Sequence, residues 1–430
     1  MLIDFRAENY RSLRDEQVLT MEAGRSGAES DLRPRRVPGH SESLLPIAVL
    51  YGANASGKSN VLGALGFMRD AIVDSHRTWS PDEGVPRDPF AWGPKKIEPS
   101  MFEVSLLIDM VRYEYGFLVS DDCVVEEWLH AWPNGKKQLW FERDANSFKF
   151  GDNLKGENKL IQEVTRSNAL FLSTAVQLKH QQLQPIFSWF RQLQTINMVR
   201  SRGPRFPTAG SSAEFWLSRL LDEGDLQRQT SFLPEEASKN SLLDGFRCLL
   251  QASDIGIVDL KIVKDEPEES GEYSRSSKRG RIHLKHQGPA DAWLPLEEES
   301  KGTRTLFRIA FPILRAIQMG GTLLIDELEA SLHPALAQKI VRQFNDPVTN
   351  PRNAQLIFTT HDTSLLGTTL GEPALRRDQV WLTEKDDEGA TVLYPLSDYK
   401  PRKAENLERG YLQGRYGAIP FLGDFAVAGE

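Results

Sequence analysis

The sequence has very little cysteine and no long apolar run. Only two cysteines occur among 430 residues, Cys123 and Cys248, and their separation does not match a metal site. Two isolated thiols are typical of reduced residues in the cytoplasm rather than of a disulfide framework. No run of 18 apolar residues is present, and Met1 is not followed by a basic segment and an apolar one. The sequence therefore predicts a cytoplasmic protein without a membrane partner.

Positive charge is not in excess either, because 52 Lys and Arg face 60 Asp and Glu for a net charge of −8. The chain as a whole is therefore not a basic nucleic-acid binder, although a local basic patch could still contact DNA. The charged segment 264–281 has a basic half that includes Arg275, Lys278, Arg279 and Arg281. We favour a solvated hairpin tip there, because charge runs are usually solvated surfaces.

Sustained heptads are also absent, so no long coiled-coil arm is expected. The length allows two or three domains, and the composition is that of a globular protein. We divide the chain into an N-terminal part at 1–155, a helical insertion at 156–253 and a C-terminal part at 254–430. Alternating apolar residues at 102–108 and 113–119 predict antiparallel strands within the first part. The sequence thus predicts an α/β fold with an antiparallel β lobe.

What the chain does contain is a phosphate-binding loop at Gly52–Asn60, of the form G-x-x-x-x-G-K-[ST]. An apolar run at 44–50 precedes it and apolar residues at helical spacing follow, which is the strand–loop–helix context that the motif needs. The glycines let backbone amides face an anion, and the helix N-terminus adds positive charge. Lys58 is expected to reach the β- and γ-phosphates, and Ser59 to offer its hydroxyl to Mg²⁺. The alternative, a chance match in a turn rich in Gly and Ser, does not explain these flanks. The predicted nucleotide contacts of this loop are Gly52, Asn54, Ala55, Ser56, Gly57, Lys58, Ser59 and Asn60.

Two more apolar runs end in polar residues. The run at 321–325 ends in Asp326 and Glu327, which places both carboxylates at the C-terminal edge of a parallel sheet, where ligands bind. We expect Asp326 to hold Mg²⁺ and Glu327 to polarise the attacking water. A strand followed by an acidic helix cap is the alternative. The run at 355–360 ends in His361, which we expect to contact the γ-phosphate, although a lone histidine at a strand end is more often structural.

A second anion site is predicted at Ser300-Lys301-Gly302-Thr303, because these residues open an apolar helix. An ordinary N-cap is the alternative for Ser300.

The order of the motifs is phosphate loop, long insertion, Ser-x-Gly, Asp-Glu strand and strand-His. This order resembles the ABC-type ATPase heads of the structural-maintenance and RecF-like group. That resemblance implies ATP and Mg²⁺ as ligands, with Lys58, Glu327 and His361 as the catalytic residues.

The resemblance also implies a dimer, or a higher oligomer, that forms around ATP. Ser300, Gly302 and Thr303 would then touch the γ-phosphate bound by the opposite subunit, and 329–331 would match the loop that crosses the interface. The turn at Asn9-Tyr10-Arg11-Ser12 is similar to the N-terminal turn beside the nucleotide in that group, which adds Arg11 and Ser12 to the candidate contacts. The group also has a glutamine loop, and Pro99-Ser100 stands where we expect it without supplying a glutamine.

A narrower resemblance rests on Gly52–Asn60, Glu299–Thr303 and the tail Tyr411–Pro420. These segments look like the ATPase subunits of bacterial abortive-infection and restriction-linked systems, RloA-like or AbiL-type. The resemblance implies phage defence with a separately encoded effector, often a nuclease of RloB or TOPRIM type, and leaves contact with DNA or a phage component possible.

Other functions remain as alternatives. They are a nucleotide-gated scaffold with negligible turnover and a RecF-like DNA-repair ATPase. A nuclease domain in the same chain is disfavoured because only about 65 residues follow the segment 361–364, too few for such a domain. The long insertion disfavours a transporter subunit. The role of the tail stays open between a partner-docking or lid segment and a packed C-terminus.

Overall fold

The computed structural model describes residues 1–24, 31–198, 244–247, 249–250, 256–263, 281–330, 332–369, 371–399 and 405–419. The predicted basic residues Arg275, Lys278 and Arg279 lie outside these ranges, as do Cys248 and Ser331. Within them, no helix is both long enough and apolar enough to cross a membrane. Among the described residues, the longest helix is α1 (Lys58–Thr78), with 21 residues. The described part of the chain therefore contains no long coiled coil.

The central sheet has six strands in the order β16-β15-β3-β14-β13-β9, and five of them are parallel. Strand β3 is buried along its whole length, as are β13 and β14. Continuous burial explains why these segments are uninterrupted apolar runs rather than alternating ones. The strands are β3 (Ile47–Gly52), β9 (Gln194–Ile196), β13 (Thr322–Ile325), β14 (Gln355–Thr359), β15 (Val380–Lys385) and β16 (Thr391–Pro395).

The second sheet is antiparallel, with seven strands in the order β2-β1-β4-β5-β6-β7-β8. It is the predicted β lobe, and Asn134-Gly135 forms the turn between β6 and β7, where Gly135 has φ 72°. The strands are β1 (Leu2–Glu8), β2 (Gln17–Thr20), β4 (Ser100–Ile108), β5 (Val111–Val119), β6 (Val124–Trp132), β7 (Gln138–Asp144) and β8 (Ser147–Phe150).

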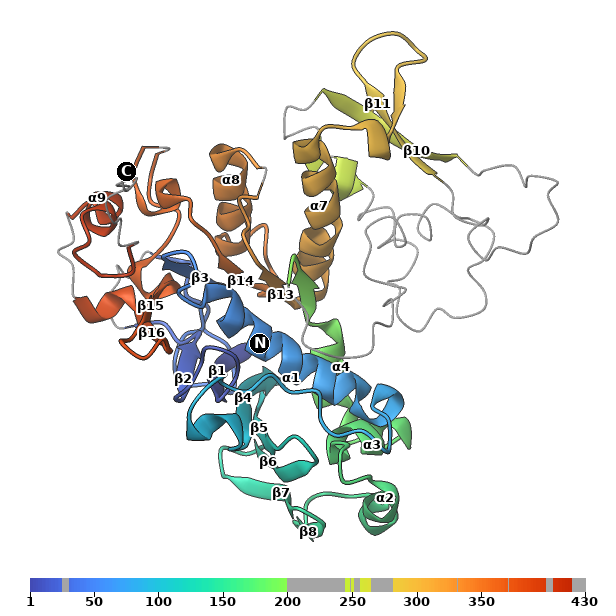
Figure 1. Cartoon of the computed structure of the whole chain (residues 1–430). Coiled ribbons are helices and arrows are strands. Elements are labelled where there is room, and N and C mark those ends of the chain that lie inside the picture. Colours follow the sequence, from blue (N-terminus) through green and yellow to red (C-terminus); the bar gives the residue numbers. More distant parts are fainter. Residues whose placement is uncertain are drawn as a thin grey trace, which may run out of the picture.

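Helix α1 lies between the two sheets and contacts both, as Figure 1 shows. Its apolar residues share one core with the β lobe and with three short helices that follow the lobe. A second core covers the other face of the central sheet, where α7 and α8 pack. Further α-helices of the described residues are α2 (Asn158–Val164), α3 (Phe171–Gln177), α4 (Gln184–Gln192), α7 (Lys301–Met319), α8 (Pro334–Asn345) and α9 (Leu407–Leu412).

The region from 156 onward is not helical throughout. Gln194–Ile196 form β9, which pairs in parallel with β13 at the edge of the central sheet. Three residues are too few to show a strand period, so the helical pattern around them concealed this strand. A third, three-stranded sheet comprises β10 (Ile257–Val263), β11 (Arg281–His286) and β12 (Trp293–Pro295), and it precedes α7.

Candidate nucleotide site

The phosphate-binding loop connects β3 to α1 as the sequence predicts. Gly57 is the N-cap of α1 and has φ 109°, a conformation that side chains rarely allow. A Cβ on Gly57 would also lie 2.0 Å from the hydroxyl of Thr391, so a larger residue has no room. Asn54 and Ala55 are exposed at the tip of the loop. The first amides of a 21-residue helix therefore open onto a loop that the solvent reaches, which suits an anion.

Lys58 is buried against its own loop. Its ammonium donates hydrogen bonds to the carbonyl oxygens of Gly52, at 2.9 Å, and Ala53, at 3.0 Å. Burial lowers the pKa of Lys58, while the carboxylates of Asp326, Glu329 and Glu327 act in the opposite direction. A lysine ammonium held by two carbonyl oxygens is fixed beside the loop and needs a nearby anion to balance its charge.

The loop meets the Asp-Glu strand directly. The hydroxyl of Ser59 donates to a carboxylate oxygen of Asp326 at 3.0 Å, and the hydroxyl of Thr359 donates to the same oxygen at 2.6 Å. Asp326 is buried and follows β13, while Thr359 ends β14. A hydroxyl and a carboxylate at this separation fit a magnesium ion that keeps several waters and binds phosphate oxygens. The described ranges contain no group of three or more His, Cys, Asp or Glu that could hold a metal ion. When bound, Mg²⁺ would neutralise phosphate charge.

Glu327 and His361 lie at the same sheet edge. Glu327 is exposed and has φ 55°, and its backbone N–H donates to the hydroxyl of Thr359 at 2.7 Å. A left-handed conformation in a non-glycine residue is strained and typical of functional sites. The backbone N–H of His361 donates to Glu329 at 2.6 Å. Burial lowers the pKa of His361 first, and the charge of Lys58 lowers it further, so the phosphate-loop lysine and this histidine share one electrostatic environment.

The N-terminal turn braces the loop from the other side. The amide of Asn60 donates to the hydroxyl of Ser12 at 2.6 Å, and that hydroxyl lies 2.7 Å from the hydroxyl of Thr391. Thr391 in turn donates to the carbonyl oxygen of Ser56 at 2.7 Å. Arg11 pairs with Asp88 at 3.2 Å. Ser12 and Asn60 thus position the loop.

The Ser-x-Gly segment lies across a pocket from the carboxylates, because Lys301 lines the same pocket as Asp326 and Glu327. Ser300 is the N-cap of α7, and its hydroxyl accepts from the backbone N–H of Thr303 at 3.1 Å. Gly302 is in the first turn of the same helix. Figure 1 shows the N-terminal end of α7 well away from the start of α1, so this anion site and the phosphate loop of the same chain are separate. The structure therefore brings together the loop, the carboxylates and the histidine, while the hydroxyl of Ser300 bonds within its own segment, to Thr303.

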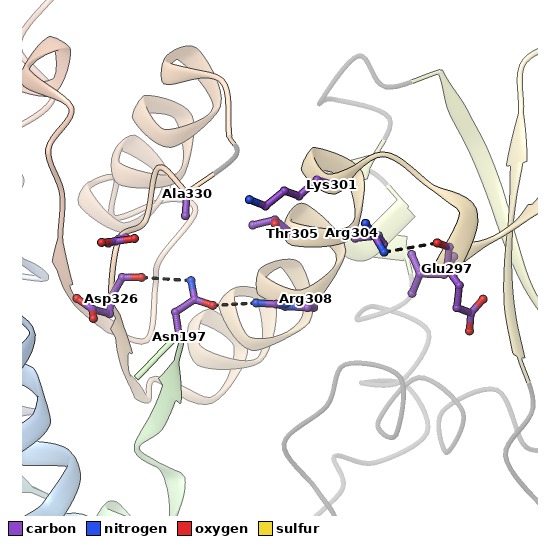
Figure 2. Close-up of a pocket in the computed structure, with 10 residues that line it drawn as sticks. Asn197, Glu297, Lys301, Arg304, Thr305, Arg308, Asp326 and Ala330 are labelled. Atoms are coloured by element: carbon purple, nitrogen blue, oxygen red, sulfur yellow. Dashed lines mark hydrogen bonds between the residues drawn. The ribbon is translucent and has the colours of Figure 1, made fainter. Parts of the chain in front are cut away.

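A pocket of about 570 Å³ separates α7 from the Asp-Glu strand (Figure 2). One wall carries Lys301, Arg304 and Arg308, and the other carries Asp326 and Glu327. The spacing of three and four residues places the three cations on one exposed stripe of the helix. The remaining lining residues are Asn197, Leu296, Glu297, Thr305 and Ala330.

Asn197 is a residue that the sequence analysis missed. It follows β9, has φ 57°, and its amide donates to the backbone carbonyl oxygen of Asp326 at 3.2 Å. Arg308 donates to the side-chain oxygen of Asn197 at 2.9 Å, so the two bonds connect α7 to the Asp-Glu strand (Figure 2). Pro99-Ser100, where we expect a glutamine loop, leads into the other sheet, because Ser100 begins β4.

The tail packs behind the phosphate loop. The rings of Tyr411 and Tyr51 meet edge to face at 5.5 Å, and Tyr51 belongs to β3. The Tyr411 hydroxyl donates to the carbonyl oxygen of Ala418 at 3.1 Å, and that of Tyr416 donates to Glu405 at 2.9 Å. Residues 405–419 of the tail are therefore a packed element of the second core.

This arrangement defines an ABC-type P-loop ATPase head, with the phosphate loop after β3, the carboxylates after β13 and the histidine after β14. The chain belongs to the family described as "AAA domain, putative AbiEii toxin, Type IV TA system", whose model matches residues 47–367. No curated protein matches the sequence. Among solved structures, the SMC head domain from Thermotoga maritima is similar at a TM-score of 0.39 and 11% identity, covering 92% of this chain and 98% of that chain. The strand order and the placement of the motifs at the ends of β3, β13 and β14 establish the fold.

Proposed function

We propose that the protein hydrolyses ATP with Mg²⁺ at a composite site formed by two copies of the chain. The observation that carries the proposal is the separation of the motifs. Ser59 and Asp326 are in hydrogen-bond contact, whereas Ser300 caps α7, whose N-terminal end lies well away from the start of α1. A second copy could present its Ser300 to phosphates bound at this loop. Binding of ATP would thereby promote dimerisation.

Glu327 is our candidate for the residue that polarises the attacking water. Its carboxylate follows that of Asp326 and is exposed toward the pocket. A carboxylate in this position can accept a proton from water as the water attacks. Lys58 and the α1 N-terminus would stabilise charge on the phosphates. His361 would contact the γ-phosphate.

We further propose that the ATPase controls a separately encoded effector, a nuclease of RloB or TOPRIM type, in defence against phage. The support is the family, whose description refers to a toxin–antitoxin system, together with the tail and motif resemblance. The test is to co-purify the chain from its native host, identify what accompanies it, and challenge cells carrying both genes with phage. Protection that survives Lys58→Ala would contradict control by ATP.

The enzymatic part is tested by ATP turnover and molar mass in solution. We expect Glu327→Gln to reduce turnover by about 100-fold or more, as for loss of a general base, and to accumulate an ATP-bound dimer. Lys58→Ala should abolish both turnover and dimer. If the wild type shows no turnover above background, with or without DNA and partner, while ATP still drives dimerisation, the protein is a nucleotide-gated scaffold.

A further inference from the structure

The tail helix α9 contacts the segment that follows β14. We call the residues His361–Gly367 the histidine segment, and its 3-10 helix, Thr363–Leu366, packs against α9. The hydroxyl of Thr363 donates to one carboxylate oxygen of Glu408 at 3.3 Å. A Cβ on Gly367 would lie 2.0 Å from the other oxygen, so the carboxylate lies against the backbone there. Glu408 therefore contacts the histidine segment at both ends of its short helix.

The same helix also contacts the start of the phosphate loop. Tyr411 lies three residues after Glu408 on α9, and its ring packs edge to face on that of Tyr51. Burial raises the pKa of Tyr411 to about 12, and a hydrogen bond from the backbone of Gly52 opposes this rise, so the hydroxyl lies beside the first residue of the loop. Residues three apart share one face of a helix, so a single face of α9 contacts both the phosphate loop and the histidine segment.

Tyr51 of β3 gives a second connection between these two parts of the site. Its side chain is fully buried, and its hydroxyl donates to the backbone carbonyl oxygen of Asp362 at 2.8 Å. The preceding residue, His361, donates its backbone N–H to Glu329 at 2.6 Å. Successive residues of the histidine segment are thus held by the loop after β13, by β3 and by α9. The position of His361 therefore depends on elements that lie far apart in the sequence.

The tail is attached in turn to β15 and β16 of the central sheet. Glu384 of β15 accepts a hydrogen bond from the backbone N–H of Ala418. The hydroxyl of Tyr394 in β16 donates to the carbonyl oxygen of Tyr416 at 3.1 Å. These bonds fix the chain that follows α9, so the helix is held both by the histidine segment and by the sheet. A side chain on a supported helix can hold a neighbouring segment in place.

We propose that Glu408 of the tail positions the histidine segment, and through it the side chain of His361 at the γ-phosphate. The inference rests on the proposed function, which supplies the role of His361. Glu408 acts through Thr363 and is therefore a positioning residue. Its loss should leave Lys58 and the phosphate loop in place, so ATP should still bind. The step that depends on His361 should slow, because small displacements of a reacting group cost large factors in rate.

Hydrogen exchange of the full chain without nucleotide tests the positioning directly. We expect Glu408→Ala to speed amide exchange in the peptide 361–367 about tenfold, as for the loss of a hydrogen bond to a charged group, and to leave 52–60 unchanged. Glu408→Gln keeps an acceptor oxygen at the same reach and should exchange like the wild type. The matched control is Arg409→Ala, which removes the exposed next side chain of α9. Equal exchange in Glu408→Ala and the wild type would overturn the proposal.

ATP turnover tests the consequence for the reaction. Glu408→Ala should lower kcat about tenfold while KM for ATP stays within about twofold, and Glu408→Gln should restore kcat. The double variant His361→Asn/Glu408→Ala should be no slower than His361→Asn alone, because both changes remove the same interaction. Additive losses would overturn the proposal, since Glu408 would then act independently of His361. If the wild type shows no turnover, the proposed function fails, and the exchange measurement still decides whether Glu408 positions the segment.

Discussion

The hydroxyl of Ser59 lies 3.0 Å from a carboxylate oxygen of Asp326, although 267 positions of sequence separate the two residues. Parallel pairing through β14 makes this contact possible, because β3 and β13 flank β14 and all three strands end at the same edge of the sheet. The contact joins the first and last parts of the nucleotide site across the long insertion. Ser59 and Asp326 are therefore the two side chains that we expect to bind Mg²⁺ together.

We therefore predict that Ser59→Ala lowers the affinity for ATP about tenfold or more when Mg²⁺ is present, because a hydroxyl ligand is lost. In the presence of a chelator, wild type and variant should bind ATP equally well. Titration with a fluorescent ATP analogue, with and without Mg²⁺, gives the affinity under both conditions. Ser147→Ala, an exposed serine of β8, is the control. An equal loss in both conditions would mean that Ser59 acts on the loop and not on the metal.

The connection from α7 to the Asp-Glu strand gives a second prediction. Asn197→Gly keeps the left-handed backbone at that position and removes the side chain, and we expect it to reduce turnover without unfolding the protein. Arg308→Ala should reduce turnover to a similar extent. Because the two residues act through one pair of hydrogen bonds, the double variant should be no slower than Asn197→Gly alone. Turnover is measured for the wild type, the two single variants and the double variant, which together form a double-mutant cycle. If the losses of turnover are additive, Asn197 and Arg308 act independently.

The sequence predicted the elements that local patterns determine. The phosphate loop, the strand before Asp326 and the strand before His361 each combine an apolar run with polar residues at its end, and burial of the central strands produces that pattern. The sequence did not indicate a role for Thr359, although it lies in the same run, two residues before His361. Its hydroxyl links Asp326 to the backbone of Glu327, a role visible only once β13 and β14 are paired.

Residues placed by long-range packing were less predictable. Asn197 follows a strand of only three residues whose position in the sheet depends on pairing with β13. The tail residue Tyr411 has an ordinary helical setting, and its contact with Tyr51 depends on the path of the whole chain. A signal for Asn197 did exist, since Gln194–Ile196 follow a helix and precede an asparagine, a residue that tolerates left-handed backbone.

A third prediction concerns the stability of the β lobe. The carboxylate of Glu127 is fully buried and accepts from the hydroxyl of Tyr115 and from the first backbone N–H groups of α3, while Arg143 lies 3.7 Å away. Glu127→Ala would leave the buried charge of Arg143 without a carboxylate, with only backbone carbonyl oxygens such as that of Ala169 as partners. We expect it to lower the free energy of unfolding by about 3–5 kcal/mol, as for other broken buried ion pairs. Denaturant unfolding measures the change. As a control, Glu126→Ala, which removes the exposed neighbouring carboxylate, should change the free energy of unfolding by about 0.5 kcal/mol or less.

A fourth prediction follows from the lowered pKa of His361. Because burial and Lys58 hold this pKa below its ordinary value of 6.5, the ring is neutral at pH 7. The pH dependence of kcat/KM for ATP reports the free protein, so kcat/KM should stay constant as the pH falls to 6.5 and decline only below it. The unfolded chain takes up the proton first, so the stability contributed by neutral His361 is present above pH 6.5 and is lost as the pH falls toward the folded pKa. His361→Asn, compared with wild type in pH series of turnover and unfolding, should remove both trends. A decline that begins above pH 6.5 would contradict the shift.

The last prediction concerns the tail. Tyr411 is buried against Tyr51 behind the phosphate loop, so Tyr411→Ala should leave a cavity and lower the free energy of unfolding by about 3–5 kcal/mol. The neighbouring Leu412 is 61% exposed, and Leu412→Ala should be nearly neutral. Saturating ATP should raise the melting temperature of both variants, because a ligand that binds only the folded state stabilises it. If Tyr411→Ala melts like wild type yet no longer binds an effector, the tail is a docking segment and its packing on the loop is incidental.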